Sequence, residues 1–180
     1  LNNVLIIVPD NDIESLKCKN LTFLISKNPR LDFIKLANKY FNIEKHNNHY
    51  NIQNFGDSVK VGKNSNISNH SILIGNIVIG DNCTIEEKVI IKGDVRIGNN
   101  VKINSGSIIG EKGIGVERDN NKIPHSFPHI GGVKIGDNVE VGSLSTISRG
   151  TLDDTIIESG VMIDVRSHIG HNSLIKKNTT

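Results

Sequence analysis

Two histidines near the end of the chain have the residue type and the spacing that proton transfer requires. His168 and His171 flank Ile169, and if this isoleucine points into a core, at least one of the histidines must point outward. A neutral imidazole accepts a proton near pH 7, and a nearby carboxylate can fix its tautomer and stabilise the imidazolium. Asp164, seven residues before His171, is the carboxylate that the spacing offers. A solvated histidine that only caps a turn is the alternative, since surface histidines are often idle.

A six-residue repeat has to position these side chains. One residue in six, aliphatic except for the first, keeps register from Phe55 to Ile109; the register resumes at Ile135, slips by four residues after Ile147 and runs on from Ile157 to Ile175. This period fits neither a helix of 3.6 residues per turn nor an alternating strand, but it fits a short strand and a turn repeated as a solenoid. The repeat therefore predicts a mainly β fold, a parallel β-helix. A β-sandwich with coincidental spacing is the alternative, which ten consecutive hexads disfavour.

The aliphatic residues of three such sides would fill a triangular prism. Stacked about 4.8 Å apart from coil to coil, each contributes roughly 1.5 to 3 kcal/mol before entropy is counted. We expect the inward Ile97→Asp to be disruptive and the outward Lys102→Asp to be nearly silent. Glycine follows the aliphatic residue in eight hexads, where we expect the corner to need unusual backbone angles. Cys83 is expected to point inward, and neither cysteine is assigned any chemistry.

The two interruptions of the repeat are where we expect function, because solenoid repeats themselves are structural. The first, residues 111–134, carries prolines, glycines, His125 and His129, and it is long enough to be a functional excursion over a coil face. The second is the four-residue slip inside residues 148–155. Counting back one coil with this slip included places Arg149 under His171, with Asp153 and Asp154 on the neighbouring bulge.

Composition divides the chain near residues 50–55. All 17 glycines lie at Gly56 or later, whereas six of the seven Phe and Tyr residues lie at Phe55 or earlier. We predict a small, partial α/β domain over 1–54, with strands at 4–8 and 21–25, a helix between 28 and 41 that turns Phe33, Ala37, Tyr40 and Phe41 to one side, and a linker over 47–54. Residues 55–180 form the β-helix domain, including the excursion 111–134. Because the chain begins with Leu1 and stops at Thr180, we expect a fragment of a longer protein.

The charge balance, the apolar pattern and the cysteine count argue against nucleic-acid binding, a membrane span and a disulfide framework. Lys plus Arg number 21 against 19 Asp plus Glu, too even for the concentrated basic patches that nucleic acids require. No apolar run approaches the roughly 18 residues of a membrane span, and no signal peptide is recognisable. Two cysteines without a CxxC pair make no disulfide framework, so a reducing compartment is expected.

The segment from Ile108 to Asn172 resembles the bacterial UDP-3-O-acylglucosamine N-acyltransferases, which are hexapeptide-repeat, left-handed β-helix enzymes. The segment 24–41, around Asn28-Pro29-Arg30-Leu31, looks like the end of that family's N-terminal nucleotide-binding domain. The resemblance rests on these motifs: Ile109-Gly110-x-x-Gly113-x-Gly115, Lys122-Ile123-Pro124, His129-Ile130-Gly131-Gly132-Val133-x-Ile135-Gly136-Asp137, Arg149-Gly150-Thr151-Leu152-Asp153-Asp154-Thr155, Ile163-Asp164 and Ile169-Gly170-His171-Asn172.

This resemblance implies a left-handed prism and an enzyme of lipid A assembly in the bacterial cytoplasm or at the inner face of the membrane. His171 would be the general base of N-acyl transfer from an acyl carrier protein thioester, or from an acyl-CoA, to the amine of a UDP-linked amino sugar. Asp164 would orient His171 or contact the sugar. No cofactor or metal is expected. The resemblance also implies a homotrimer whose active sites lie between adjacent prisms. The residues expected to bind substrate are Arg149, Asp153, Asp154, His168, Asn172, His129, Gly131 and Gly132.

Three other functions stay open at this point. An acetyl-CoA-dependent N-acetyltransferase of surface glycans would share fold and base; Ile114 and Val116, where relatives carry aromatics, and the His129–Gly132 run point in that direction. A γ-class carbonic anhydrase would hold zinc with three histidines, and this chain has His125, His129, His168 and His171 in its second half. A structural or ice-binding solenoid would favour Thr or Ser ladders, whereas we expect outer faces of Lys, Asp and Asn.

Overall fold

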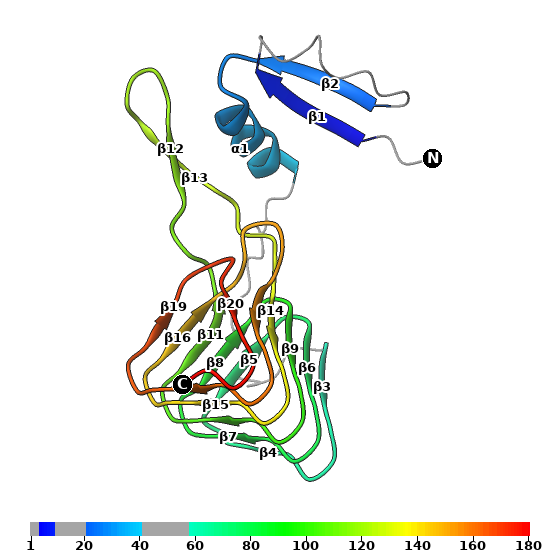
Figure 1. The fold of residues 1–180 in the computed structure, drawn as a ribbon, viewed down its shortest axis with the longest axis vertical. Coiled ribbons are helices and arrows are strands. Elements are labelled where there is room, and N and C mark those ends of the chain that lie inside the picture. Colours follow the sequence, from blue (N-terminus) through cyan, green and yellow to red (C-terminus); the bar gives the residue numbers. More distant parts are fainter. Residues whose placement is uncertain (1–3, 10–20, 41–57) are drawn as a thin grey trace. The chain divides into compact units, whose positions relative to one another are not determined.

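The computed structural model describes residues 4–9, 21–40 and 58–180, and their contacts form two compact units (Figure 1). The first unit contains β1 (Val4–Pro9), β2 (Leu21–Ser26), α1 (Pro29–Tyr40) and the hairpin of β12 (Val116–Arg118) and β13 (Pro124–Ser126). The second contains the repeats. The predicted linker 47–54 lies outside the described residues. Nothing among the described helices is long and apolar enough to cross a membrane.

The first unit pairs two parallel strands with one helix. β1 and β2 lie where the apolar runs predicted them, with Val8 opposite Ile25. α1 begins after Asn28, whose Oδ1 accepts the Leu31 N–H at 3.0 Å, as expected of an N-cap residue. Its buried side consists of Leu31, Ile34 and Ala37, whereas Tyr40 is 69% exposed. The predicted apolar side was therefore right for Ala37 and wrong for Tyr40.

The hairpin packs on α1. The ring of Phe127 lies 6.4 Å from that of Phe33 and 4.8 Å from the guanidinium carbon of Arg30, and the Nε of Arg30 lies 3.1 Å from Glu117. These contacts place residues 114–128 in the first unit. The prediction had assigned the whole excursion 111–134 to the repeat domain, and the difference arises because the excursion carries its own aromatic residue to α1.

The repeats form a three-sided parallel β-helix, as predicted. Side 1 contains β3 (Val59–Val61), β6 (Ile77–Ile79), β9 (Val95–Ile97), β14 (Val133–Ile135), β17 (Thr155–Ile157) and β20 (Leu174–Ile175). Side 2 contains β4 (Asn66–Ile67), β7 (Thr84–Ile85), β10 (Lys102–Ile103), β15 (Glu140–Val141) and β18 (Met162–Ile163). Side 3 contains β5 (Ile72–Ile74), β8 (Ile90–Lys92), β11 (Ile108–Glu111), β16 (Thr146–Ser148) and β19 (His168–Ile169).

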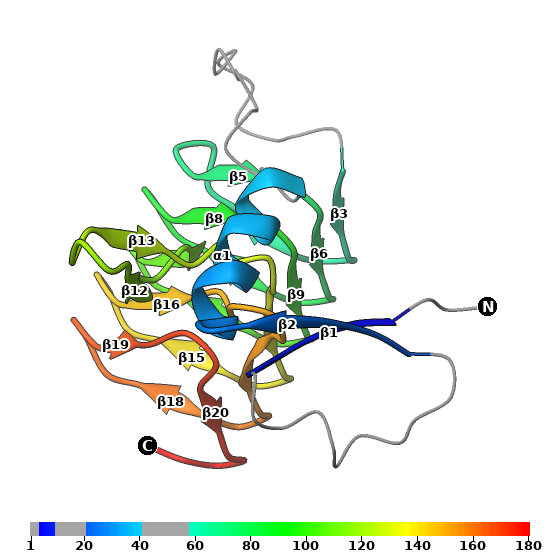
Figure 2. The ribbon, with the colours of Figure 1, turned by 90° about the horizontal axis from the view of Figure 1, so that it is seen from above.

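The two interruptions loop out, and the register of the coils resumes after each, with one local shift between Ile109 and Glu111 where the excursion begins. Partners in neighbouring coils are 18 residues apart, but 38 apart across the excursion and 22 apart across the slip. In Figure 1 the chain passes clockwise from side 1 through side 2 to side 3. Figure 2, seen from above, shows that the later coils lie nearer to the viewer of Figure 1. The β-helix is therefore left-handed.

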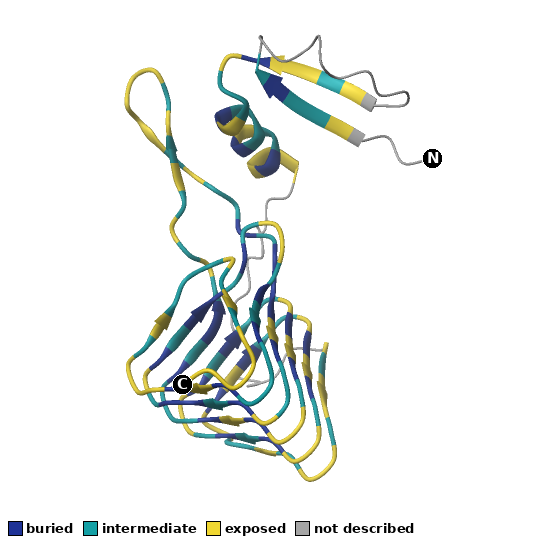
Figure 3. Cartoon of the chain, in the orientation of Figure 1, coloured by how far each residue is buried: buried dark blue, intermediate teal, exposed yellow. Residues whose placement is uncertain are grey.

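A column of aliphatic side chains fills the prism. Ile79, Ile97 and Ile135 stack in register on side 1, and each is at most 4% exposed; buried positions alternate with exposed ones along the coils in Figure 3. Cys83 is inward and 1% exposed, as predicted. At the two ends of the column Val61 is 45% exposed and Ile175 is only partly buried, because no described coil covers them.

The glycines that follow the aliphatic residues have a different cause from the one predicted. Among those described, Gly110 alone has a positive φ, of 81°. A Cβ on Gly80 would lie 2.6 Å from the carbonyl oxygen of Gly98, and one on Gly98 would lie 2.8 Å from the amide nitrogen of Asp137. Hence these glycines are required by the close approach of the next coil. Among the described non-glycine residues with a positive φ, six of ten are asparagines, such as Asn64 with φ of 55°, which tolerate this region well.

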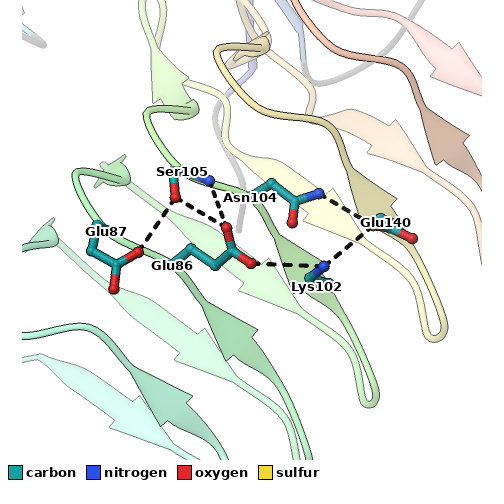
Figure 4. A network of polar contacts seen from close by, with 6 residues as sticks. All are labelled: Glu86, Glu87, Lys102, Asn104, Ser105 and Glu140. Atoms are coloured by element: carbon teal, nitrogen blue, oxygen red, sulfur yellow. Dashed lines mark hydrogen bonds and ion pairs between the residues drawn. The ribbon is translucent and has the colours of Figure 1, made fainter.

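The outer faces of sides 2 and 3 differ in chemistry. On side 2, Lys102 lies 3.7 Å from both Glu86 and Glu140, within the polar network of Figure 4. The expectation that Lys102→Asp is nearly silent is therefore corrected, because a third carboxylate would stand between two others. Side 3 instead presents Ile72, Ile90 and Ile108 in register on its outer face, with Ile72 40% exposed. The expectation of Lys, Asp and Asn on the outer faces was wrong for this side.

Candidate active site

Both interruptions and the His171-Asn172 pair lie at one corner of the prism, where side 3 passes to side 1. The excursion leaves after β11, the slip follows β16, and His171 follows β19. Since β11, β16 and β19 are neighbours in one sheet, these three segments lie on successive coils at the same corner. Residues far apart in sequence are thus brought together around His171.

The imidazole of His171 is half-buried and has contacts on several sides. Its Nδ1 lies 3.0 Å from Nδ2 of Asn172 and 3.3 Å from Oγ1 of Thr151. The ring of His129 approaches edge-on, with 4.9 Å between centroids and 78° between planes. Across from these, a Cβ on Gly113 would lie 2.7 Å from Cδ2 of His171. His171 is therefore held in a corner, whereas the exposed His168 is the histidine of the pair that points outward.

Asn172 connects the backbone next to the His171 ring with Thr151 and Thr155 through hydrogen bonds. It occupies the left-handed region with φ of 59°, and its N–H donates to Oγ1 of Thr155 at 3.0 Å. Its Oδ1 accepts the Thr151 N–H at 2.7 Å, and its Nδ2 donates to Oγ1 of Thr151 at 3.1 Å. Because a backbone N–H can only donate, Oδ1 must face Thr151, and Nδ2 is left to donate to Nδ1 of the neutral imidazole.

The slip forms a bulge that is tied to the returning end of the excursion. Gly132 donates its N–H to Oδ1 of Asp154 at 2.7 Å, and Lys134 lies 2.7 Å from Oδ2 of the same carboxylate. The hydrogen bond from Lys134 lowers the pKa of Asp154 most, and the Gly132 N–H and the charges of Lys134 and Arg96 add to this against the opposing effect of burial. Asp154 and Gly132, predicted to bind substrate, thus hold the bulge.

The neighbouring Gly131 is also part of this tie. Ile130 and Gly131 donate their N–H groups to the carbonyl oxygen of Thr151, at 2.8 and 3.3 Å. A Cβ on Gly131 would lie 2.9 Å from the carbonyl oxygen of Gly150, so the segment passes too closely beneath the bulge for any other residue. Asp153, in contrast, is exposed, which leaves its carboxylate accessible to a ligand.

Arg149 points away from His171, toward the preceding coils. Its guanidinium lies over Gly93, where a Cβ would be 3.1 Å from one terminal nitrogen, and burial lowers the pKa of Arg149 despite the attraction of Glu111. Burial alone would raise the pKa of Glu111, but the hydrogen bonds from Lys92, 2.7 Å away, and from the Lys112 N–H, with the charges of Lys92 and Arg149, lower it overall. The prediction had placed Arg149 under His171; the slip puts Thr151 there instead.

Two further predicted residues are not brought to His171 within one chain. Asp164 is exposed at the corner between sides 2 and 3, where its Oδ1 accepts the N–H of Val165 at 2.8 Å. The whole of β19 separates it from His171. His168 is exposed on the outer face of side 3, with Nδ1 2.6 Å from Oγ1 of Thr146.

Of the histidines considered for a metal site, His129 and His171 lie together at this corner. Within the hairpin, Nε2 of His125 lies 3.1 Å from Asp119, and His168 lies on the outer face of side 3. No group of three or more His, Cys, Asp or Glu side chains suited to a metal occurs in the described ranges 4–9, 21–40 and 58–180.

Sequence reasoning missed two contributors to the corner, Thr151 and Gly113. Both could have been found: Thr151 lies within the slip, and Gly113 begins a Gly-x-Gly run directly after the hexads end. The coil length was applied to His171 and Arg149 but not to the end of β11, which lies at the same corner as the end of β19.

Comparisons with known proteins agree with this architecture. The family model described as bacterial transferase hexapeptide (six repeats) matches residues 76–111. The UDP-3-O-acylglucosamine N-acyltransferase of Idiomarina loihiensis is 49% identical over 76 residues, which are 42% of this chain and 22% of the relative. The enzyme of the same name from Coxiella burnetii is 46% identical over 77 residues, 43% of this chain and 22% of the relative.

The resemblance predicted from the motifs is thereby confirmed for the repeat region. The matched part spans less than a quarter of the length of these curated relatives. Among solved structures, the acetyltransferase domain of PglB from Neisseria gonorrhoeae superposes with a TM-score of 0.39 at 11% identity, covering 89% of this chain and 68% of that one.

Proposed function

We propose that this chain carries the catalytic corner of an N-acyltransferase, which moves an acyl group from an acyl carrier protein thioester to the amine of a UDP-linked amino sugar. The observation that carries the proposal is the convergence of the excursion, the bulge and the His171-Asn172 pair at one corner. The names of the relatives matched over the repeats support the substrate class.

The chemistry needs one residue that accepts a proton. The amine nitrogen attacks the thioester carbonyl carbon and becomes a positively charged nitrogen, which must lose a proton before the tetrahedral intermediate collapses to the amide. His171 takes that proton as a neutral imidazole on Nδ1, the nitrogen that carries the lone pair when Asn172 donates to it, and the Nδ2 contact of Asn172 must open for the amine to reach it. When the C–S bond breaks, the thiolate leaves and recovers a proton from the imidazolium, so the base is restored.

Glycine-rich turns had been expected to supply N–H donors for the oxyanion. The Gly131 and Gly132 N–H groups already donate to Thr151 and Asp154, so we do not assign them this role. Asp153, His168 and Asn172, all exposed, are predicted substrate-binding residues whose side chains could meet a ligand.

A second copy of the chain is part of the proposal. β19 separates Asp164 from His171 within one chain, and the outer face of side 3 carries a column of isoleucines, of which Ile72 is exposed and Ile90 and Ile108 are half-buried. A partly exposed apolar column of this kind is typical of an association surface. We propose a homotrimer in which a neighbouring prism covers side 3 and supplies the groups that a single corner lacks.

The test is acyl transfer to UDP-linked amino sugars, measured with acyl carrier protein and CoA thioesters of several chain lengths. We expect turnover with the acyl carrier protein donor and the same rate after chelation of metals. Activity with acetyl-CoA alone would show that the proposed donor is wrong and would support the surface-glycan alternative. Ile114, which stands where relatives carry an aromatic residue and is 86% exposed, motivates this alternative. Stoichiometric zinc that is retained and required would overturn the acyl-transfer proposal.

A further inference from the structure

We propose that His129, together with Gly113, is a positioning residue that sets the plane of the His171 ring by its shape. The proposal rests on the proposed function in that His171 is taken as the proton acceptor. His129 had been predicted to bind substrate, but it is only 3% exposed and therefore cannot present its ring to a ligand.

The position of His129 is fixed by the backbone on which the His171 site depends. Directly after His129, the N–H groups of Ile130 and Gly131 donate to the carbonyl oxygen of Thr151. Thr151 in turn lies 3.3 Å from Nδ1 of His171 through its Oγ1. The end of the excursion and the bulge therefore hold His129 edge-on against His171 at 4.9 Å.

Gly113 closes the space on the other side of the two rings. A Cβ at this position would lie 2.7 Å from Cδ2 of His171 and 3.3 Å from Nε2 of His129. Ordinary carbon contacts begin near 3.4 Å, so not even a methyl group fits without displacing His171. Gly113 and His129 thus limit the tilt of the ring, while Asn172 and Thr151 hold its Nδ1.

Such a limit affects the rate because general-base catalysis depends on the direction of the lone pair. A displacement of about 1 Å at a reacting group can cost roughly 100-fold in rate. An imidazole can rotate about its Cβ–Cγ bond, and the hydrogen-bond contacts of the His171 ring with described residues are all made at Nδ1. Packing by His129 and Gly113 is what restricts this rotation.

The experiment removes or adds volume and then restores it. His129→Ala removes the packing, His129→Gln and His129→Phe keep comparable bulk, and Gly113→Ala adds a methyl group. His125→Gln, in the hairpin of the same excursion, is the matched control. Two readouts are taken on the folded protein: kcat and KM of acyl transfer, and the side-chain NMR signals of the His171 ring, which do not depend on turnover.

We expect His129→Ala and Gly113→Ala each to lower kcat about 10- to 100-fold with KM within about twofold, and to shift or broaden the His171 ring signals. His129→Gln or Phe should restore most of kcat. In the double variant the losses should be less than multiplicative, because each change relieves the other. His125→Gln should leave both readouts unchanged.

Unaltered kcat and ring signals in His129→Ala would overturn the proposal. So would a loss in His129→Gln and His129→Phe equal to that in His129→Ala, because it would show that the imidazole acts through its chemistry. If no donor supports turnover at all, the proposed function fails, whereas shifted ring signals in His129→Ala and Gly113→Ala would still support the positioning of His171.

Discussion

A pair of glycine substitutions distinguishes the two explanations for glycine at the corners. Gly98 and Gly170 both follow an inward isoleucine, but a Cβ on Gly98 would lie 2.8 Å from the Asp137 nitrogen, whereas one on Gly170 meets nothing within 4 Å. In Gly98→Ala the coils must separate by about 0.6 Å to reach ordinary contact, and overpacking of this kind costs about 1 to 3 kcal/mol. Gly170→Ala should be neutral or stabilise by about 0.4 to 1 kcal/mol through the unfolded chain.

The assay is urea and thermal unfolding of the two variants beside the wild type. At about 2 to 4 °C per kcal/mol for a chain of this size, Gly98→Ala should lower Tm by several degrees and Gly170→Ala should not. Equal losses at the two positions would refute the reasoning, because they would show that the corner conformation itself, and not the next coil, requires glycine.

Three further outcomes follow from the contacts. Ile97→Asp leaves a carboxylate between Ile79 and Ile135 and should cost more than about 5 kcal/mol, so circular dichroism should show an unfolded protein; Lys102→Ser on side 2 should cost less than about 1 kcal/mol, and a folded Ile97→Asp would contradict the inward register. Asp154→Asn should lower the free energy of unfolding at pH 7 but much less in acid, because the lowered pKa of Asp154 means that its contribution is full at neutral pH and lost as the pH falls through and below the ordinary carboxyl value; a difference between wild type and variant that does not change with pH would argue against this. Asn172→Gly keeps access to φ of 59° but loses the amide contacts, so it should lower kcat; Asn172→Ala should also be about 1 kcal/mol less stable than Asn172→Gly, and equal unfolding midpoints would contradict the backbone role.

The fold could be predicted because each six-residue repeat corresponds to one side of a coil. Each aliphatic residue of the hexads meets its equivalent in the next coil, so Ile97 and Ile103 could be called inward from spacing alone. The reason for the glycines could not be predicted in this way. It depends on how closely two coils approach, and the residues around Gly80 and Gly98 in the sequence do not indicate that distance.

The site was predicted only in part, because small offsets decide which side chains meet. His171 and the two interruptions were identified, but the slip moved Thr151, not Arg149, next to the ring. Asp164 lies seven residues before His171, and with six residues to a side this distance places it one corner away. The isoleucines of side 3 recur only every 18 residues, a period that a search for six-residue repeats does not reveal.

The most direct measurement is the rate of acyl transfer to a UDP-linked amino sugar by His171→Gln, with His70→Gln, an exposed residue of the first coil, as the control. A residue that accepts the amine proton contributes roughly 100- to 10,000-fold, so kcat should fall by at least 100-fold in His171→Gln and remain unchanged in His70→Gln. Full turnover by His171→Gln, in a protein that folds as the wild type does, would contradict the assignment of the corner between sides 3 and 1 as the active site.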